Sequence, residues 1–145
     1  MDVDLQGALR RLLAEYGCAA LYVFGSRADE IAARLTGTAP AAHASSHPGS
    51  DVDIGVEPER GVRLTAEQRV LLTLALEDLF AVARVDLVVL PEASAPLAAE
   101  VVRGELLVCS DPDAEAETQL YYLRRLGDLA PYYHEQFREL LGIEP

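Results

Sequence analysis

Lysine is absent from this sequence of 145 residues, so all 12 basic side chains are arginines. They are outnumbered by 24 acidic side chains, which gives a formal net charge of -12. Such an acidic chain repels nucleic acid and anionic membranes, so neither is expected as its main partner. A basic protein, or a nucleotide bound to a metal ion, fits this charge better.

Cysteine and long apolar runs are also scarce. The two cysteines, Cys18 and Cys109, each lie beside an apolar run, and we expect both to be buried reduced thiols. No apolar stretch reaches the roughly 20 residues that span a membrane. The N-terminus carries Asp2, Asp4 and then an amphipathic pattern, which does not indicate a signal peptide. We therefore expect a soluble cytoplasmic protein.

Helical and strand-like patterns alternate along the chain. Apolar residues spaced three and four apart predict helices, and short β-branched runs predict strands. Length and composition are those of one ordinary domain, residues 1–145. The expected class is α/β, or α+β, with one mixed sheet flanked by helices and a C-terminal helical segment. Helices are predicted at 5–16, 27–35, 65–80, 94–102 and 111–142, and strands at 19–24, 51–57, 85–90 and 105–109.

Two segments interrupt this alternation. Residues 37–50 are rich in Ala, Ser, Thr, Pro and His without periodicity, which predicts an inserted mobile loop. His43 and His47 lie four residues apart in it, but we expect no metal site in a loop of this composition. Pro131 clashes with the preceding turn of a helix, so we expect a kink there or two helices broken near Gly127.

The most informative stretch joins an apolar run to a pair of aspartates. Gly25-Ser26 ends the run, and free backbone N–H groups between a strand and a helix can bind an anion. Asp51 and Asp53 are one residue apart in a second apolar run, so in a strand their side chains share a face. Paired carboxylates resist burial unless a cation joins them, and Mg²⁺ is the usual cation for oxygen ligands. A phosphate binder facing a Mg²⁺ binder is the layout of a nucleoside-triphosphate site.

Asp86 is the third acidic residue of this set. It lies inside the apolar run Val85–Leu90, where a charged residue is seldom found without a partner. If this strand pairs beside the one that carries Asp51 and Asp53, all three carboxylates can share one face. Three carboxylates around one or two Mg²⁺ ions suit two-metal catalysis, in which one ion lowers the pKa of the attacking hydroxyl and the other holds the triphosphate.

In chain order, Gly25-Ser26, Asp51-Val52-Asp53 and Asp86 resemble the signature of the nucleotidyltransferase superfamily typified by DNA polymerase β. Within it, the chain resembles the minimal nucleotidyltransferase (MNT) antitoxins of HEPN–MNT toxin–antitoxin pairs over nearly its whole length. The resemblance implies the nucleotidyltransferase fold, ATP as substrate, a two-metal Mg²⁺ site and AMP transfer to a protein hydroxyl.

The resemblance also implies roles for single residues. The three aspartates, Asp51, Asp53 and Asp86, would bind Mg²⁺ and form the catalytic set, and Asp86 would also help to activate the acceptor. The positions that would bind the nucleotide are Gly25, Ser26, Arg27 and Ser50.

The chain departs from the family pattern in two ways. The spacer between Gly-Ser and the aspartate pair runs from Arg27 to Ser50, which is longer than usual. Asp29 and Glu30 follow Arg27-Ala28, where the family often has Arg-Gly. Two readings of Arg27 therefore stay open: it contacts a phosphate, or it forms a salt bridge with an acid.

The expected function is that of an antitoxin which transfers AMP from ATP to a tyrosine hydroxyl of a partner HEPN ribonuclease toxin. About 35 residues follow the last predicted strand, fewer than the helical second domain of small-molecule nucleotidyltransferases needs. Two alternatives remain: a small-molecule nucleotidyltransferase, and a catalytically idle MNT module that neutralises its toxin by binding alone. The aromatic residues expected to serve as core or as protein contacts are Tyr121, Tyr122, Tyr132 and Tyr133.

Overall fold

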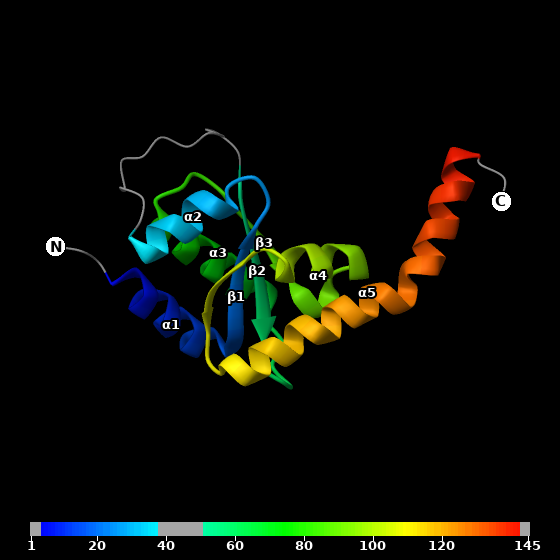
Figure 1. Ribbon diagram of the computed structural model, residues 1–145. Helices are drawn as coiled ribbons and strands as arrows, with labels where there is room; N and C mark the ends of the chain where they lie inside the picture. Colours follow the sequence, from blue (N-terminus) through cyan, green and yellow to red (C-terminus); the bar gives the residue numbers. More distant parts are fainter. Residues whose placement is uncertain (1–3, 38–50, 143–145) are drawn as a thin grey trace.

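The structure is a computed structural model that describes residues 4–37 and 51–142 (Figure 1). Helices and strands follow one another in the order that the sequence predicts. The predicted loop at 37–50, with His43, His47 and Ser50, lies outside the described residues apart from Gly37. The elements are α1 (Leu5–Tyr16), β1 (Cys18–Phe24), α2 (Ala28–Thr36), β2 (Val52–Pro58), α3 (Ala66–Phe80), β3 (Val85–Val89), the 3-10 turn η1 (Leu90–Glu92), α4 (Ala95–Val102), β4 (Glu105–Cys109) and α5 (Pro112–Leu141).

The four strands form one mixed sheet in the order β3-β2-β1-β4. β1 lies antiparallel to both β2 and β4, whereas β2 and β3 are parallel. Because β1 and β2 run in opposite directions, the end of β1 lies beside the start of β2, where Phe24 pairs with Asp53. Gly25 and the aspartates therefore meet at one end of the sheet, and the α/β prediction with a mixed sheet is confirmed.

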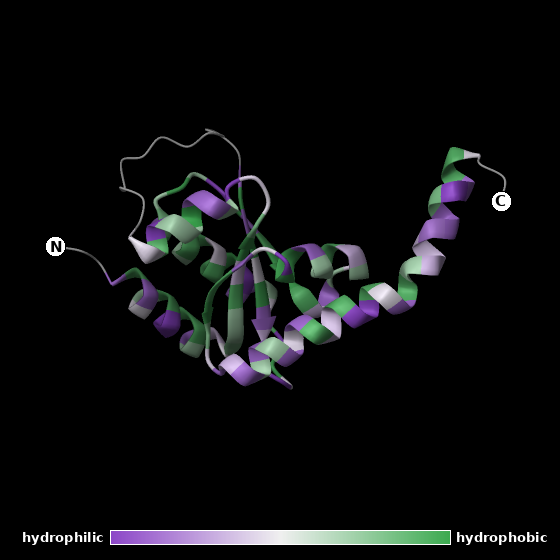
Figure 2. Cartoon of the chain, in the orientation of Figure 1, coloured by the Kyte–Doolittle hydropathy of each residue, from purple (hydrophilic) through white to green (hydrophobic). Residues whose placement is uncertain are grey.

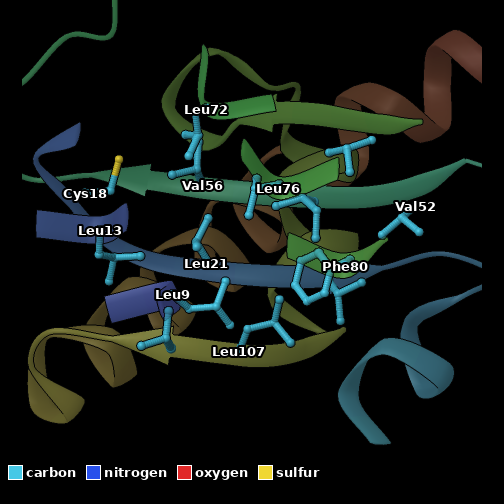
Figure 3. Close-up of a cluster of buried hydrophobic side chains, with 14 of the residues drawn as sticks. Leu9, Leu13, Cys18, Leu21, Val52, Val56, Leu72, Leu76, Phe80 and Leu107 are labelled. Carbon is cyan, nitrogen blue, oxygen red and sulfur yellow. The ribbon is translucent and has the colours of Figure 1, made fainter. Parts of the chain in front are cut away.

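Side chains that alternate along the strands give the sheet two apolar faces. Helices α1, α2 and α3 cover one face, and α4 and the first half of α5 cover the other (Figure 1). Figure 2 shows hydrophobic residues along the strands and mixed character on the helices. The larger core lies under α1, α2 and α3, and ten of its members are labelled in Figure 3: Leu9, Leu13, Cys18, Leu21, Val52, Val56, Leu72, Leu76, Phe80 and Leu107.

Local signals in the sequence explain most of the boundaries. The Thr65 hydroxyl accepts from the Gln68 backbone N–H, and the Gln68 side chain accepts from the Thr65 N–H, so the α3 capping box forms. Gly17 ends α1 in the left-handed conformation, as expected. Both cysteines are free thiols, but only Cys18 is buried; Cys109, near the end of β4, is half-buried.

The C-terminal segment is one continuous helix, so the expectation of two helices broken near Gly127 is wrong. Pro131 lies inside α5, and Figure 1 shows the helix bending in its second half, in agreement with the expected kink. Up to Tyr122 and Leu123 the helix packs on the second face of the sheet. Beyond the bend it extends away from the sheet, with large apolar side chains exposed: Tyr132, Phe137, Leu140 and Leu141.

A buried hydrogen bond fixes the first half of α5 to the sheet. The Tyr22 hydroxyl, on β1, donates to Oε2 of Glu115 over 2.7 Å, and the Gln119 side-chain amide donates to the same oxygen over 2.6 Å. The pKa of the Tyr22 hydroxyl is raised, mainly because the group is buried and secondly because it donates a hydrogen bond to Glu115. Glu115 is the only buried charged residue in the part of the chain that the structure describes, and these two donors compensate its burial.

The structure contains, within residues 4–37 and 51–142, no helix that combines the length and the apolar character needed to cross a bilayer.

Removing the Glu115 carboxylate should leave the Tyr22 hydroxyl buried without its acceptor. We expect Glu115→Ala to lower the free energy of unfolding by about 1–3 kcal/mol, measured by urea denaturation. Glu117→Ala, which removes an exposed carboxylate from the same helix, is the matched control and should change stability by less than about 0.5 kcal/mol. Equal losses in the two variants would contradict this role for the Tyr22–Glu115 pair.

Candidate active site

Gly25 forms the turn at which β1 ends. Its φ is +80°, in the left-handed region that favours glycine, and its carbonyl accepts from the Ala28 N–H at the start of α2. Ser26 follows and is exposed. The turn therefore presents the Gly-Ser backbone and the first turn of α2 at the open end of the sheet, as the sequence predicted.

Gly25 also lies against Asp53. A Cβ at position 25 would lie 2.3 Å from Oδ2 of Asp53, closer than two such atoms can approach. The contact follows from the antiparallel register, in which Asp53 pairs with Phe24, the residue before the turn. Only glycine satisfies both the backbone angle and the space at this position.

Asp53 and Asp86 lie side by side. They are register partners in the parallel pairing of β2 with β3, so their side chains share one face of the sheet. That face is the one covered by α4 and α5, because Val52 and Ile54, the neighbours of Asp53, point into the core under α1, α2 and α3. Asp53 is half-buried and Asp86 is exposed, so the pair opens towards solvent.

Asp51 lies just before β2, and its carboxylate takes a different partner. Its Oδ1 is 3.9 Å from Nε of Arg84, and the Arg84 side chain is 78% exposed. An exposed ion pair at this distance contributes little stability, so Asp51 can exchange Arg84 for another cation at small cost. The structure thus places Asp53 beside Asp86, whereas the Asp51 carboxylate lies nearby and faces Arg84.

Negative charge accumulates around Asp53. Its burial, followed by the charges of Asp86, Asp51 and Glu100, raises the pKa of its carboxyl group above the ordinary value. Glu100, on α4, is a fourth acid that the sequence analysis missed. It is a lone acid in the otherwise apolar helix 95–102, a signal of the same kind as the one that identified Asp86.

The donor set fits a hard cation, although it is not arranged as a finished metal site. Oxygen ligands from several carboxylates are what Mg²⁺ prefers, and a cation would relieve the repulsion that raises the pKa of Asp53. No group of three acidic, histidine or cysteine side chains within residues 4–37 and 51–142 is placed so as to hold a metal ion. For all three aspartates to hold one metal ion, the Asp51 side chain would have to leave Arg84.

Arg27 is engaged by an acid within its own helix. Its Nε and Nη2 donate to the two carboxylate oxygens of Glu30 over 3.2 and 2.8 Å, and Arg34 donates to Glu30 as well. The side chains of Arg27 and Glu30 are only 10% and 12% exposed. Of the two readings of Arg27, the structure shows the salt bridge.

A depression of about 670 Å³ opens beside this turn. Its walls come from the end of β1, the start of α2, the outer side of α4 and Leu126 of α5. Pro96, Glu100 and Arg103 line it from α4 and the residue after it, at positions i, i+4 and i+7, which share one helical face. The candidate active site is therefore the aspartate face together with this depression.

Substituting alanine for Gly25 should displace the Asp53 carboxylate. We expect Gly25→Ala to weaken binding of Mg²⁺ with ATP, the ligand expected from the sequence, by about 10- to 100-fold in calorimetric titration. Gly37→Ala is the matched control: its φ is +74°, but a Cβ there meets no described residue within 4 Å, so this variant carries the backbone strain without the clash. Equal affinities in the two variants would show that the Gly25–Asp53 contact does not shape the site.

The raised pKa of Asp53 predicts a pH-dependent effect on stability. A carboxyl group whose pKa rises on folding favours the fold below its ordinary pKa, and that contribution is lost as pH increases through the raised value. Asp53→Asn should therefore raise the melting temperature of the ligand-free protein at pH 7 by about 2–4 °C, and by less as the pH approaches 4. Asp78→Asn, at an exposed position on α3, should give no such difference; an unchanged or lower melting temperature for Asp53→Asn at pH 7 would be the contrary result.

Comparison with known proteins gives one family match. The family model described as "Polymerase beta, Nucleotidyltransferase" matches residues 8–113, which include all of the predicted site residues. Among curated proteins no significant match was found.

Several solved structures share the fold. A chain from a toxin–antitoxin crystallised with AMP-PNP superposes with a TM-score of 0.70 and 20% identity, over 94% of this chain and 98% of that one. A chain from the MntA–HepT toxin–antitoxin gives a TM-score of 0.65 with 18% identity, over 94% and 97%. A chain from the complex of tri-AMPylated Shewanella oneidensis HEPN toxin with MNT antitoxin gives 0.64 with 20% identity, over 94% and 96%. The family match over most of the sequence, together with the shared fold, shows that this chain belongs to the polymerase β nucleotidyltransferase family.

Proposed function

We propose that the protein is an antitoxin that transfers AMP from ATP to a tyrosine hydroxyl of a partner HEPN ribonuclease toxin. The observation that carries the proposal is the pairing of Asp53 with Asp86 directly beside the Gly25 turn, in a member of a nucleotidyltransferase family. The fold it shares with chains of toxin–antitoxin complexes, one of which holds a tri-AMPylated toxin, supports the choice of partner.

The donor half of the reaction uses the turn and the aspartates. Backbone N–H groups of Gly25 and Ser26, with the first turn of α2, would hold the triphosphate. Asp51, Asp53 and Asp86 would hold Mg²⁺, which when bound supplies charge neutralisation for the phosphates and lowers the pKa of a hydroxyl. Ser50 and Arg27 complete the nucleotide-binding set proposed from the sequence; Ser50 lies outside the described residues, and Arg27 would have to leave Glu30 to reach a phosphate.

The transfer itself is an in-line displacement. The tyrosine oxygen forms a bond to the α-phosphorus while the bond to the bridging oxygen breaks, and pyrophosphate leaves. The phenol proton needs an acceptor, and Asp86 is the exposed carboxylate of the pair, so it can face the incoming hydroxyl. Asp53, more buried and held against Gly25, would keep its place and position the phosphates.

The acceptor comes from outside the described residues. The depression is open, and beyond its Leu126 wall the second half of α5 extends into solvent with Phe137 and Leu140 60% and 84% exposed. Large exposed apolar side chains on a projecting helix are typical of a protein contact. A partner bound to this helix would lie beside the depression and could insert a tyrosine into it.

Charge and chemistry agree with an RNA-binding partner. The net charge of -12 favours encounter with a basic protein. AMP on a tyrosine near the RNA site of such a protein would add bulk and negative charge, and would therefore repel its substrate.

Intact-mass spectrometry tests the proposal. Purified protein and its partner toxin are incubated with ATP and Mg²⁺, and the toxin is expected to gain the mass of one or more AMP units. Asp53→Asn should lower the rate at least about 100-fold, whereas Asp78→Asn, the exposed aspartate on α3, should leave it unchanged.

The two alternative functions give different results in the same experiment. If Asp51→Asn/Asp53→Asn protein neutralises the toxin fully and the wild-type reaction leaves the toxin mass unchanged, the protein acts by binding alone. If the toxin mass is unchanged while a small hydroxylated molecule is adenylylated at the cost of ATP, the protein is a small-molecule nucleotidyltransferase.

A further inference from the structure

Arg103 lines the depression of the candidate active site but has no role in the function proposed above. It follows α4 directly and lines the same depression as Gly25 and the start of α2. It shares a helical face with Glu100, whose charge acts on Asp53. Arg103 thus lines the same depression as the turn that begins α2.

The backbone fixes this position. The Arg103 N–H donates to the Ala99 carbonyl and the Gly104 N–H to the Val101 carbonyl, so the chain closes α4 without a loop. A Cβ on Gly104 would lie 2.4 Å from the Val23 carbonyl oxygen, so this glycine allows the chain to pass against the end of β1. Glu105 then pairs with Val23 in the sheet. The Arg103 side chain therefore starts from a rigid point next to the Gly25 turn.

Arg103 is exposed, and its guanidinium carries no salt bridge within the described residues. Arg27 is bound to Glu30, and Arg84 lies beside Asp51, but Arg103 forms no ion pair or side-chain hydrogen bond with any residue of the described ranges 4–37 and 51–142. Asp29, Glu100 and Glu105 line the same depression, but none of them forms a salt bridge with Arg103. An unpaired guanidinium on a rigid support is instead suited to an anionic ligand.

We propose that Arg103 binds the β- and γ-phosphates of the nucleotide, the part that leaves as pyrophosphate; this rests on the proposed function. A guanidinium offers a planar fork of N–H donors that fits phosphate oxygens, in a depression whose other wall is the Gly25 turn. Negative charge moves onto the pyrophosphate as its bond to the α-phosphorus breaks, and a cation fixed beside it stabilises that charge. The surrounding acids disfavour a free anion, so the ligand is a phosphate chain that arrives with a metal ion.

Calorimetric titration with three probes tests this role. With Mg²⁺ present, Arg103→Ala should weaken binding of ATP and of inorganic tripolyphosphate by about 10- to 100-fold, because charged hydrogen bonds are lost. Binding of adenosine, which has no phosphate, should be unchanged. Arg103→Lys should recover part of the affinity, since lysine keeps the charge but not the fork. Arg60→Ala, in the exposed turn at the opposite end of the sheet, is the matched control and should bind all three probes like wild type.

The outcomes separate this proposal from the proposed function. If wild type and Arg103→Ala bind ATP and tripolyphosphate equally well, Arg103 is not a phosphate ligand, while the nucleotidyltransferase site stands. A loss that is equally large for adenosine would also overturn the proposal, because it would indicate a general change of the site. If wild type binds neither ATP nor tripolyphosphate, the proposed function fails, and this inference fails with it.

Discussion

The pairing of β2 with β3 places two carboxylates side by side. The rest of the site depends on the fold holding this pair together in spite of the repulsion between the two charges. Parallel register sets Asp53 opposite Asp86, and antiparallel register with β1 brings Gly25 against the same carboxylate. Burial of Asp53, followed by the charges of Asp86 and its other acidic neighbours, raises the pKa of this carboxyl group on folding. Like charges held together at a cost in stability are characteristic of functional sites, where a ligand supplies the opposite charge.

One face of the sheet carries the larger hydrophobic core, and the other face carries the candidate active site. One face carries the large core under α1, α2 and α3, which holds β2 rigidly through Val52, Ile54 and Val56. The other face carries the aspartates, α4 and the first half of α5, where the Tyr22–Glu115 hydrogen bond holds the long helix in place. Because alternate residues of β2 serve the two faces, a core packed by valine and isoleucine positions Asp53 with little freedom.

Much of this could be predicted from sequence because the signals are local. Alternation in 51–57, the capping box at Thr65 and the positive φ of Gly17 each depend on a few neighbouring residues. The sequence predicts that Asp53 meets Asp86 only if their two strands are neighbours in the sheet. Strand order depends on contacts between residues distant in sequence, so this condition could not be checked from local patterns. Two further features could not be predicted from local patterns.

The first is the partner of a charged side chain. Whether Arg27 binds a phosphate or Glu30, and whether Asp51 faces the other aspartates or Arg84, depends on side-chain placement in three dimensions. The second is the contribution of α4: Glu100, and Arg103 directly after the helix, line the depression beside the Gly25 turn because α4 ends beside β1. The sequence also left open whether the last helix kinks at Pro131 or breaks near Gly127, and the structure shows one helix that continues through Pro131.

We expect the aspartate face to bind a nucleotide through a metal ion. The most direct measurement is the melting temperature of wild type and of Asp51→Asn/Asp53→Asn with ATP, in Mg²⁺ and in EDTA. Since a ligand that binds only the folded state adds RT ln(1 + [L]/Kd), ATP at 100 times its Kd should stabilise the wild type by about 2.7 kcal/mol in Mg²⁺. In EDTA the gain should be much smaller, and the Mg²⁺-dependent part should be absent from the double variant. Equal shifts with and without Mg²⁺ in the wild type would show that the nucleotide does not bind through a metal ion.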